Sequence, residues 1–564
     1  MRKKIARSVA LGLVGLLIQQ GSGAAFGPPP QGPPTTWPIK HVVVIFQENV
    51  SFDHYFATYP VAANTDGSPF YAADGTPTVN GLSASLLTNN PNFNNPANNT
   101  LDSSAINPFR LSHSEASTCD QDHNYGAEQL AFDEGLMDAF PLNTGSESFC
   151  NPFYTYGQND SVVMGYFDGN TVTALWNYAQ NFAMSDDFFG TTFGPSTPGA
   201  LNVVAGTTYP VTPTGLLSPK IVSNPGGGAI VGDLDPTGDL CSASTTTGTT
   251  IQMGGKNIGD LLNAQGLSWG SFMGGFDLTV TNSNGTTGCN RSSPATPANS
   301  TTVPPPANNF TKDYIPHHAW FQYWASTANP SHTRPSVAPS LYGTSGDAAN
   351  HEYDTHDFFD ALNAGNLATV SYLKAPANMD GHAGYSDPLL EQQFVVTVVN
   401  AIEQSRFWRD TAIFVTWDDS DGWYDHQMNP IVNPSAESNS TNPPTTTTQY
   451  SDNLNGFGKC GNGTPLKDDH DKVINGRCGY GPRIPLLVIS PYAKQNFVDH
   501  GLSDQSSIVR FIEDNWSLGR IGNGSFDALA GSLVNLFDFS QHPNNGNDVL
   551  FLEPSSGEPF YNHY

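Results

Sequence analysis

The chain has 564 residues, and its 51 Asp and Glu against 22 Lys and Arg give a formal net charge of −29 at pH 7. Because nucleic acids and anionic bilayers are bound by surfaces rich in Lys and Arg, this charge argues against both as partners. Charged residues make up only 13% of the chain, against about 25% in an average soluble protein, whereas 38% are hydrophobic; the chain can therefore bury a large core, which excludes general disorder.

The N-terminus has the pattern of a secretory signal peptide. Four basic residues within positions 2–7 precede an apolar run at 9–18, and small residues follow at 21–25. The run is shorter than the roughly 20 residues that cross a bilayer, and no later apolar run is longer. We therefore expect residues 1–25 to be removed and the mature protein to be secreted or periplasmic, without a transmembrane segment. An uncleaved N-terminal anchor is the alternative.

Three continuous apolar runs predict buried strands, at Val42–Phe46, Ala412–Trp417 and Ile484–Ile489. Runs without polar alternation are typical of strands buried on both faces, as in a parallel sheet. Between them, apolar residues recur at helical spacing from Leu389 to Ser405. This alternation predicts an α/β fold with a mostly parallel central sheet sandwiched by helices, in which ligands bind beyond the carboxyl ends of the strands.

Long loop insertions are expected between these elements. The chain contains 55 Gly and 43 Pro, and several segments rich in Asn, Thr, Pro and Ser bury too little apolar area to offset the entropy of ordering. We expect these segments to be surface loops. They are residues 89–100, 245–250, 293–309 and 433–449.

The six cysteines fit an oxidising compartment, in which three disulfides could form in several connectivities. We favour pairing between sequence neighbours, because each bridge then closes a loop inside a region rich in Gly and Pro. A thiolate metal site is disfavoured by the wide spacings. The favoured pairs are Cys119–Cys150, Cys241–Cys289 and Cys460–Cys478.

Oxygen-bearing side chains follow two of the predicted strands. Glu48 and Asn49 come after the first strand, and Asp418 and Asp419 come directly after the second. A carboxylate and an amide that face two adjacent carboxylates supply hard oxygen ligands for a divalent cation. Turns capped by Asx side chains are the alternative explanation.

A tight turn at residues 193–199, Phe-Gly-Pro-Ser-Thr-Pro-Gly, leads into an apolar stretch with helical character. It presents Ser196 near the expected N-terminus of a helix, where free N–H groups and a partial positive charge suit a phosphoryl group. Ser196 is therefore a candidate nucleophile, although an ordinary serine N-cap would produce the same pattern.

Histidines could supply the local positive charge that a phosphate site needs in a chain with so few Lys and Arg. His123 and His426 each follow an aspartate, His317 and His318 are adjacent, and His382 lies in an Asp-Gly-His segment. Each of them alone is more often structural than catalytic. Together they favour a site in which histidines contact phosphate and transfer protons.

Taken in chain order, these motifs resemble those of the secreted phosphoesterase family that includes bacterial phospholipases C and respiratory-burst-inhibiting acid phosphatases. The resemblance extends over residues 38–516. The matching segments are residues 47–56, 122–123, 135–140, 164–167, 193–201, 317–320, 380–382, 418–419, 481–485 and 489–492.

The resemblance implies an alkaline-phosphatase-like fold with one divalent metal ion at the strand ends and a covalent phosphoserine intermediate. By position, the metal ligands match Glu48, Asn49, Asp418 and Asp419, and the nucleophile matches Ser196. The phosphate-contacting and proton-transfer positions match His123, His317, His318 and His382.

These expectations give a domain plan: a signal peptide at 1–25, a phosphoesterase catalytic domain with inserts at 38–516, and a C-terminal extension packed on it at 517–564. The expected activity is metal-dependent hydrolysis of phosphomonoesters or of phospholipid headgroup phosphodiesters. Relatives often carry Glu where this chain has Asp419, which gives it a shorter second acid. A non-catalytic secreted binding protein on the same scaffold and a sulfatase-like hydrolase are the alternatives.

Overall fold

The structure is a computed structural model. It describes residues 34–145, 159–216, 218–243, 246, 248–295, 310–438, 449–540 and 549–560. The predicted signal peptide, residues 1–25, lies outside the described residues. From Thr35 onward the chain clusters into one unit.

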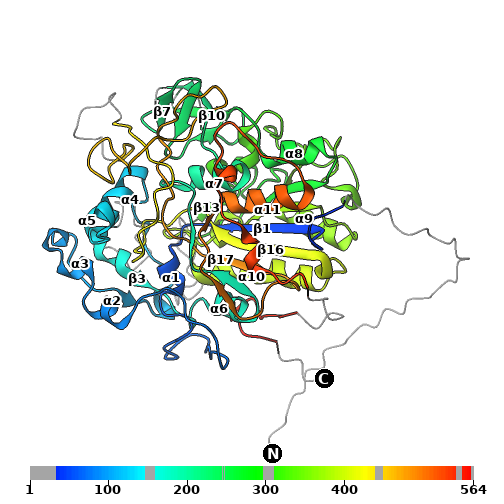
Figure 1. The fold of residues 1–564 in the computed structure, drawn as a ribbon. Helices are drawn as coiled ribbons and strands as arrows, with labels where there is room; N and C mark the ends of the chain where they lie inside the picture. The colour runs from blue at the N-terminus through cyan, green and yellow to red at the C-terminus, as the bar shows by residue number, and fades with distance from the viewer. Residues whose placement is uncertain are drawn as a thin grey trace, which may run out of the picture. The chain divides into compact units, whose positions relative to one another are not determined.

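The centre of that unit is an eight-stranded sheet with the strand order β14-β11-β15-β1-β16-β17-β4-β18 (Figure 1). Its strands are β1 (His41–Gln47), β4 (Ala183–Ser185), β11 (Trp269–Met273), β14 (Glu352–Asp354), β15 (Val370–Lys374), β16 (Thr411–Trp417), β17 (Leu486–Ile489) and β18 (Phe497–Asp499). All neighbouring pairs in this sheet are parallel except those of β17. The predicted α/β class with a mostly parallel sheet is confirmed.

The register of β1 and β16 determines where the residues that follow these two strands lie. These strands are buried along nearly their whole length, and they pair in parallel from His41 opposite Thr411 to Gln47 opposite Trp417. Because the two strands end level with each other, the residues that follow them emerge at the same edge of the sheet.

Strand β17 runs opposite to the direction that the parallel-sheet prediction required. It pairs antiparallel with both β16 and β4. An apolar run indicates burial on both faces but carries no information about strand direction. The reversal means that residues preceding β17, including Pro485, lie at the edge where β16 ends; Thr416 Oγ1 donates to Pro485 O at 2.9 Å.

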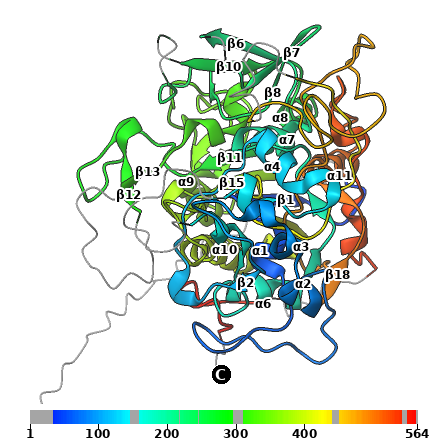
Figure 2. The ribbon, with the colours of Figure 1, turned by 90° about the vertical axis from the view of Figure 1, so that its left-hand side faces the viewer.

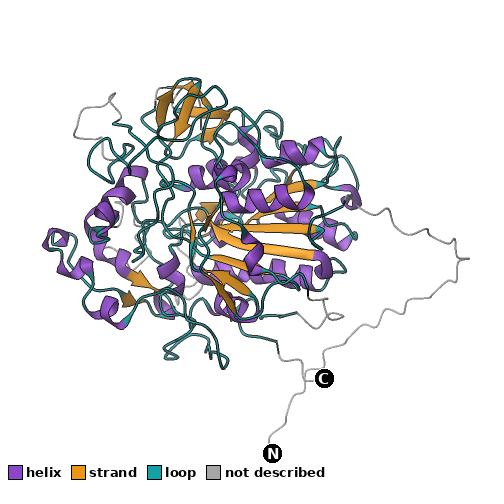
Figure 3. Ribbon diagram, in the orientation of Figure 1, coloured by secondary structure: helices purple, strands orange, loops and turns teal. Residues whose placement is uncertain are grey.

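Helices cover both faces of this sheet (Figure 3). In the orientation of Figure 1, α7 and α11 lie above the strands, and α6 and α10 lie below. The helix predicted from Leu389 to Ser405 is observed as α10, and its Val395, Val398 and Ile402 are fully buried. The helices are α1 (Phe52–Phe56), α2 (Ala84–Thr88), α3 (Pro91–Asn94), α4 (Tyr125–Phe132), α5 (Phe140–Asn143), α6 (Thr173–Asn181), α7 (Ser196–Ala205), α8 (Ile258–Ala264), α9 (Thr355–Asn363), α10 (Pro388–Glu403) and α11 (Ser506–Trp516).

Smaller sheets are built from the insertions. A five-stranded sheet of order β7-β8-β6-β10-β9 lies apart from the hairpin formed by β12 and β13 (Figure 2). The remaining strands are β2 (Phe109–Arg110), β3 (Gly165–Tyr166), β5 (Phe188–Phe189), β6 (Val211–Gly215), β7 (Ile221–Asn224), β8 (Gly227–Ile230), β9 (Asp235–Pro236), β10 (Thr249–Met253), β12 (Ser292–Pro294), β13 (Phe310–Lys312) and β19 (Ser503–Asp504). None of the helices in the described part of the chain has the length and apolarity to span a bilayer.

Residues 89–100 lie mostly at the surface, as expected, but they are not one irregular loop. Asn90, Asn92 and Asn98 are fully buried, and the segment contains α3. Its asparagine side chains replace the missing apolar contacts with hydrogen bonds: Asn90 caps α3 and donates to Tyr424 Oη at 2.9 Å. Buried polar side chains of this kind are stable because their donors and acceptors are paired.

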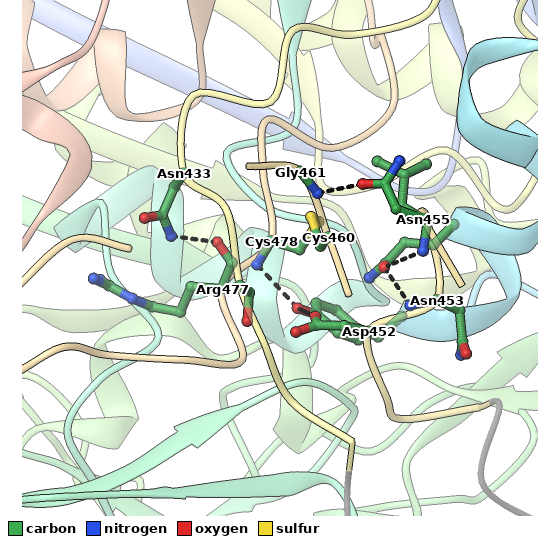
Figure 4. The surroundings of a disulfide bond; sticks show 12 residues. Asn433, Asp452, Asn453, Asn455, Cys460, Gly461, Arg477 and Cys478 are labelled. Carbon is green, nitrogen blue, oxygen red and sulfur yellow. Dashed lines mark hydrogen bonds between the residues drawn. A yellow bond between two sulfur atoms is a disulfide. The ribbon is translucent and has the colours of Figure 1, made fainter. Parts of the chain in front are cut away.

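Two of the three favoured disulfides, Cys241–Cys289 and Cys460–Cys478, are confirmed. The third involves Cys150, which lies outside the described residues. Around Cys478 the backbone is fixed on both sides: its N–H donates to Tyr125 Oη at 2.9 Å, and its carbonyl accepts from Phe193 N at 3.0 Å. Figure 4 shows the surroundings of the bridge, where the side chain of Asn433 donates to Arg477 O. The Cys460–Cys478 bridge therefore anchors the chain directly before the turn that contains Ser196.

Candidate active site

The ends of β1 and β16 bring four of the predicted residues together. Asn49 N donates to Asp418 Oδ1 at 3.0 Å, and Val50 N donates to Asp419 O at 2.9 Å. Asn49 turns the chain away from the sheet with a φ of 57°, a left-handed conformation that asparagine adopts more readily than most residues. Glu48 and the two aspartates are buried.

Ser196 is the first residue of α7 and lies against this group of acids. Its Oγ donates to Glu48 Oε2 at 3.2 Å and is 3.4 Å from Asp419 Oδ2. The close approach depends on Gly199, one turn along α7, because a Cβ atom at that position would lie 2.2 Å from Asp418 O. The helix backbone is thus pressed against the end of β16.

Several oxygen atoms at the strand ends lack hydrogen-bond donors among the described residues. Asn49 Oδ1 and Asp418 Oδ2 are buried and unpartnered. Burial, and then the charge of Asp418, raises the pKa of Asp419 well above its usual value. Buried acceptors without donors are costly, and a divalent cation with oxygen ligands would satisfy them. The residues present therefore fit a metal ion.

Lys374 is a site residue that the sequence analysis missed. It ends β15, next to β1, and its Nζ forms an ion pair with Glu48 Oε1 inside the protein. Burial lowers the pKa of Lys374, and nearby carboxylates, Asp418 first among them, oppose that shift. The strand that carries it was not among the three predicted from apolar runs, so its end was not searched.

His317 and His318 lie next to the Ser196 turn, in a short 3₁₀ helix at Pro316–His318. His318 Nδ1 is 3.1 Å from Glu48 Oε1, and burial lowers its pKa well below the usual range, so the ring is neutral. His317 is more exposed, and its carbonyl accepts a hydrogen bond from Thr197 Oγ1 at 3.3 Å.

The pKa values of the two rings shift in opposite directions because their neighbours differ. Burial opposes protonation of His317, but the carboxylates of Asp233 and Asp235 outweigh it and raise the pKa of His317. Asp235 Oδ1 is 3.7 Å from His317 Nδ1, and Asp233 Oδ1 accepts from Thr197 N at 2.9 Å. A protonated imidazole beside the candidate nucleophile can donate a proton to a leaving group.

His123 and His382 form the other histidine pair, with ring centroids 6.0 Å apart. Burial opposes protonation of His123, yet the surrounding carboxylates, Asp419 and Asp421 above all, raise its pKa well above the usual value. Burial lowers the pKa of His382. His123 Nε2 is 3.4 Å from Asn49 Nδ2, which connects this pair to the strand-end acids.

His426 lies in a separate cluster. Its Nδ1 is 2.7 Å from Asp53 Oδ2, and the buried Arg483 forms ion pairs with both Asp53 and Asp425. Arg483 fixes the loop after β16 to the start of α1, which is a structural role. Among the described residues, no hydrogen bond or ion pair connects His426 directly to Ser196 or to the strand-end acids.

Comparison with known proteins identifies the family to which the sequence belongs. A sequence model described as the Phosphoesterase family matches residues 39–519. The non-hemolytic phospholipase C of Pseudomonas aeruginosa is 23% identical over 513 residues, which are 90% of this chain but 58% of that protein. Phospholipase C B of Mycobacterium tuberculosis is 22% identical over 547 residues, 95% of this chain and 83% of the other. The chain thus spans less than two thirds of the first relative.

Two solved structures are distant neighbours. A protein in the alkaline phosphatase superfamily from Vibrio parahaemolyticus shares 12% identity, with a TM-score of 0.25 over 77% of each chain. Murine ectonucleotide pyrophosphatase/phosphodiesterase 5 also shares 12% identity, with a TM-score of 0.29 over 65% of this chain and 95% of the other.

Proposed function

This chain belongs to the Phosphoesterase family, and we propose that it is a secreted, metal-dependent hydrolase of phosphoric esters that acts through a covalent phosphoserine at Ser196. The proposed substrates are phosphomonoesters or phospholipid headgroup phosphodiesters, since several relatives bear the name phospholipase C. The observation that carries the proposal is the position of Ser196 Oγ, 3.2 Å from Glu48 Oε2 at the N-terminus of α7.

One divalent cation would be held by Glu48, Asn49, Asp418 and Asp419. The unpartnered oxygens of Asn49 and Asp418 support this assignment. When bound, such an ion supplies positive charge that makes the serine hydroxyl more acidic and offsets the charge on the phosphoryl oxygens. Lys374 contributes a further positive charge beside Glu48.

The protein's own groups then account for the proton transfers. As Ser196 Oγ attacks phosphorus, the Oγ–P bond forms and the ester P–O bond breaks. The hydroxyl proton passes to the Glu48 carboxylate, which already accepts its hydrogen bond. The departing oxygen takes a proton from the imidazolium of His317, and the neutral ring then takes a proton from the water that attacks the phosphoserine. As the Oγ–P bond breaks, Ser196 Oγ takes back its proton from Glu48.

The remaining histidines, His123, His318 and His382, are proposed to face the phosphoryl oxygens. Their contacts support this arrangement, because His318 reaches Glu48 and His123 reaches Asn49. Interactions that strengthen as charge develops on those oxygens stabilise the transition state.

The test is Ser196→Ala, assayed with an aryl phosphate and with lecithin micelles. Both activities should be lost, and acid-quenched wild-type protein should carry one phosphoryl group on the peptide that contains Ser196. The matched control is Thr197→Ala, which removes the neighbouring hydroxyl and should leave the covalent adduct on Ser196. Turnover by Ser196→Ala at the wild-type rate would contradict the mechanism. Release of phosphate but not of phosphocholine would identify a phosphatase.

Export is proposed from two features. The N-terminal 25 residues have the pattern of a signal peptide, and disulfides such as Cys460–Cys478 form in oxidising compartments. Fractionation of a producing bacterial cell should recover the protein from the medium or periplasm with its N-terminus beginning near residue 26. Recovery of uncleaved protein in the membrane fraction would favour an anchor.

A further inference from the structure

Arg477 is a buried arginine that none of the proposed catalytic steps uses. Its side chain has no solvent exposure, and Figure 4 shows it directed away from the neighbouring Cys460–Cys478 bridge. One of its nitrogens, Nη1, donates to Thr207 Oγ1 at 3.0 Å and to Gly524 O at 2.8 Å. Burial lowers the pKa of Arg477 to about 10, so the group still carries its positive charge at neutral pH.

The other two nitrogens of this guanidinium, Nε and Nη2, are buried and have no hydrogen-bond acceptor among the described residues. They lie on one edge of the planar group, where an N–H bond of each points the same way. Arginine uses this edge to hold both oxygens of a carboxylate, or one anion between two donors. Because buried donors without acceptors lose the hydrogen bonds that water would give them, such an edge favours an acceptor against it.

Two other buried arginines show what this edge binds elsewhere in the protein. In Arg291 and Arg483, Nη1 donates to backbone carbonyls, whereas Nε and Nη2 donate to aspartate carboxylates. The aspartates are Asp313 and Asp354 for Arg291, and Asp425 and Asp53 for Arg483. Arg477 repeats the first half of this arrangement, with Nη1 on Gly524 O, but within the described part of the chain no Asp or Glu pairs with it.

The groups that act electrostatically on Arg477 add no negative charge at neutral pH. They are the phenols of Tyr209 and Tyr125. Burial raises the pKa of both phenols, so both hydroxyls are neutral at pH 7. A buried charge that lacks a counter-charge is strongly destabilising. The positive charge of Arg477 therefore favours an anion at its free edge.

We propose that the Nε–Nη2 edge of Arg477 is a structural anion site that binds one chloride ion. A single negative charge matches the single charge of the guanidinium. A larger anion, such as a phosphate ester, needs an opening to solvent, and the Arg477 side chain has none. The neutralised guanidinium stabilises the contacts of Nη1 with Thr207, which follows α7, and with Gly524. The inference concerns the stability of the fold and does not depend on turnover of any ester.

The first test measures thermal unfolding of the mature, disulfide-bonded protein as chloride replaces gluconate at constant ionic strength. An ion that binds only the folded state raises the melting temperature as its concentration increases past the dissociation constant. The melting temperature of wild type should therefore rise with the logarithm of the chloride concentration, and that of Arg477→Met should not. The matched control is Arg409→Met, which removes one positive charge from an exposed side chain and should keep the rise. A wild type with the same melting temperature in both salts, or an Arg477→Met variant that keeps the full rise, would overturn the proposal.

The second measurement uses wild type alone, so it decides the question even if Arg477→Met does not fold. Crystals are grown in bromide, which replaces chloride and is located by its anomalous scattering. We expect a bromide peak within hydrogen-bond distance of both Nε and Nη2 of Arg477. A water molecule in that position without an anomalous peak would overturn the proposal. So would a bromide peak in a protein whose melting temperature does not respond to chloride, because that result means binding at crystal concentration only.

Discussion

Glu128 Oε2 accepts a hydrogen bond from Gly194 N at 2.9 Å. Its other oxygen, Oε1, accepts from Ser420 Oγ at 2.7 Å. One buried carboxyl group on α4 therefore connects the turn before Ser196 with the loop after Asp419. Burial raises the pKa of Glu128 to about 8, so the group is largely protonated at neutral pH.

Removing this connection should lower catalysis more than binding. Glu128→Ala leaves two buried donors without acceptors, at a cost of about 1–3 kcal/mol each, and frees the Ser196 turn. We expect kcat for an aryl phosphate to fall about tenfold or more with a nearly constant KM. Glu128→Gln keeps one acceptor for Gly194 N, and the Ser420 hydroxyl can rotate to accept from the new amide; it should retain most activity. Equal losses in both variants would contradict the positioning role.

Gly199→Ala should displace α7 from the end of β16. The added Cβ would lie 2.2 Å from Asp418 O, a backbone atom that cannot rotate away. Because a misplacement of about 1 Å can reduce a rate on the order of a hundredfold, kcat should fall by that order. Ala200→Gly is the control: it loses about 1 kcal/mol of helix stability without a clash and should keep kcat. A crystal structure of Gly199→Ala with α7 unmoved would refute the explanation.

The pH dependence of hydrolysis should report His317. Asp233 and Asp235 raise its pKa above 6.5 against the effect of burial, and the protonated ring is the proposed acid. The rate should therefore fall as the pH rises through that pKa. Asp235→Asn lowers the pKa and should move this alkaline limb to lower pH. Lys220→Met should move it to higher pH, since the charge of Lys220 lowers the pKa of His317. If the alkaline limb of the pH–rate profile stays at the same pH in both variants, His317 is not the acid.

Lys374→Met should lower the stability of the metal-free protein and increase the stabilisation that added metal gives. Without metal, the variant leaves the buried Glu48 without its lysine partner, and breaking a buried pair costs about 3–5 kcal/mol. The same change removes a positive charge that competes with a cation for Glu48. The melting temperature of chelator-treated Lys374→Met should thus be lower than that of wild type, and added metal should raise it by more than it raises that of wild type. Thermal unfolding with and without metal measures both effects.

Local sequence predicted that the residues after β1 and β16 meet at one edge of the sheet, because each of these strands has an unmistakable apolar run. Glu48 and Asp418 needed only the rule that parallel strands end at one edge. Lys374 was missed because β15 is short and contains Ser371 and Tyr372, so its pattern is weak. The direction of β17 was wrong since an apolar run has no polarity along the chain.

Contacts between distant segments could not be read from the sequence. Glu128 lies on a helix whose apolar residues surround it, and nothing local shows that it reaches Gly194 and Ser420. The burial of Asn90, Asn92 and Asn98 was missed for the same reason, because partners such as Tyr424 Oη are far along the chain. In both cases polar side chains are stabilised by hydrogen bonds whose donors and acceptors come together only in the fold.

The Cys460–Cys478 bridge has a consequence for when the protein becomes active. The carbonyl of Cys478 holds Phe193 N, and its N–H is bound to Tyr125 at the start of α4, just after His123. Before oxidation, the segment that carries Cys478 is not fastened to Cys460, and the Ser196 turn and the His123 loop lose a shared support. Under the proposed function, chains in a reducing compartment should therefore hydrolyse phosphoesters poorly until the bridge has formed.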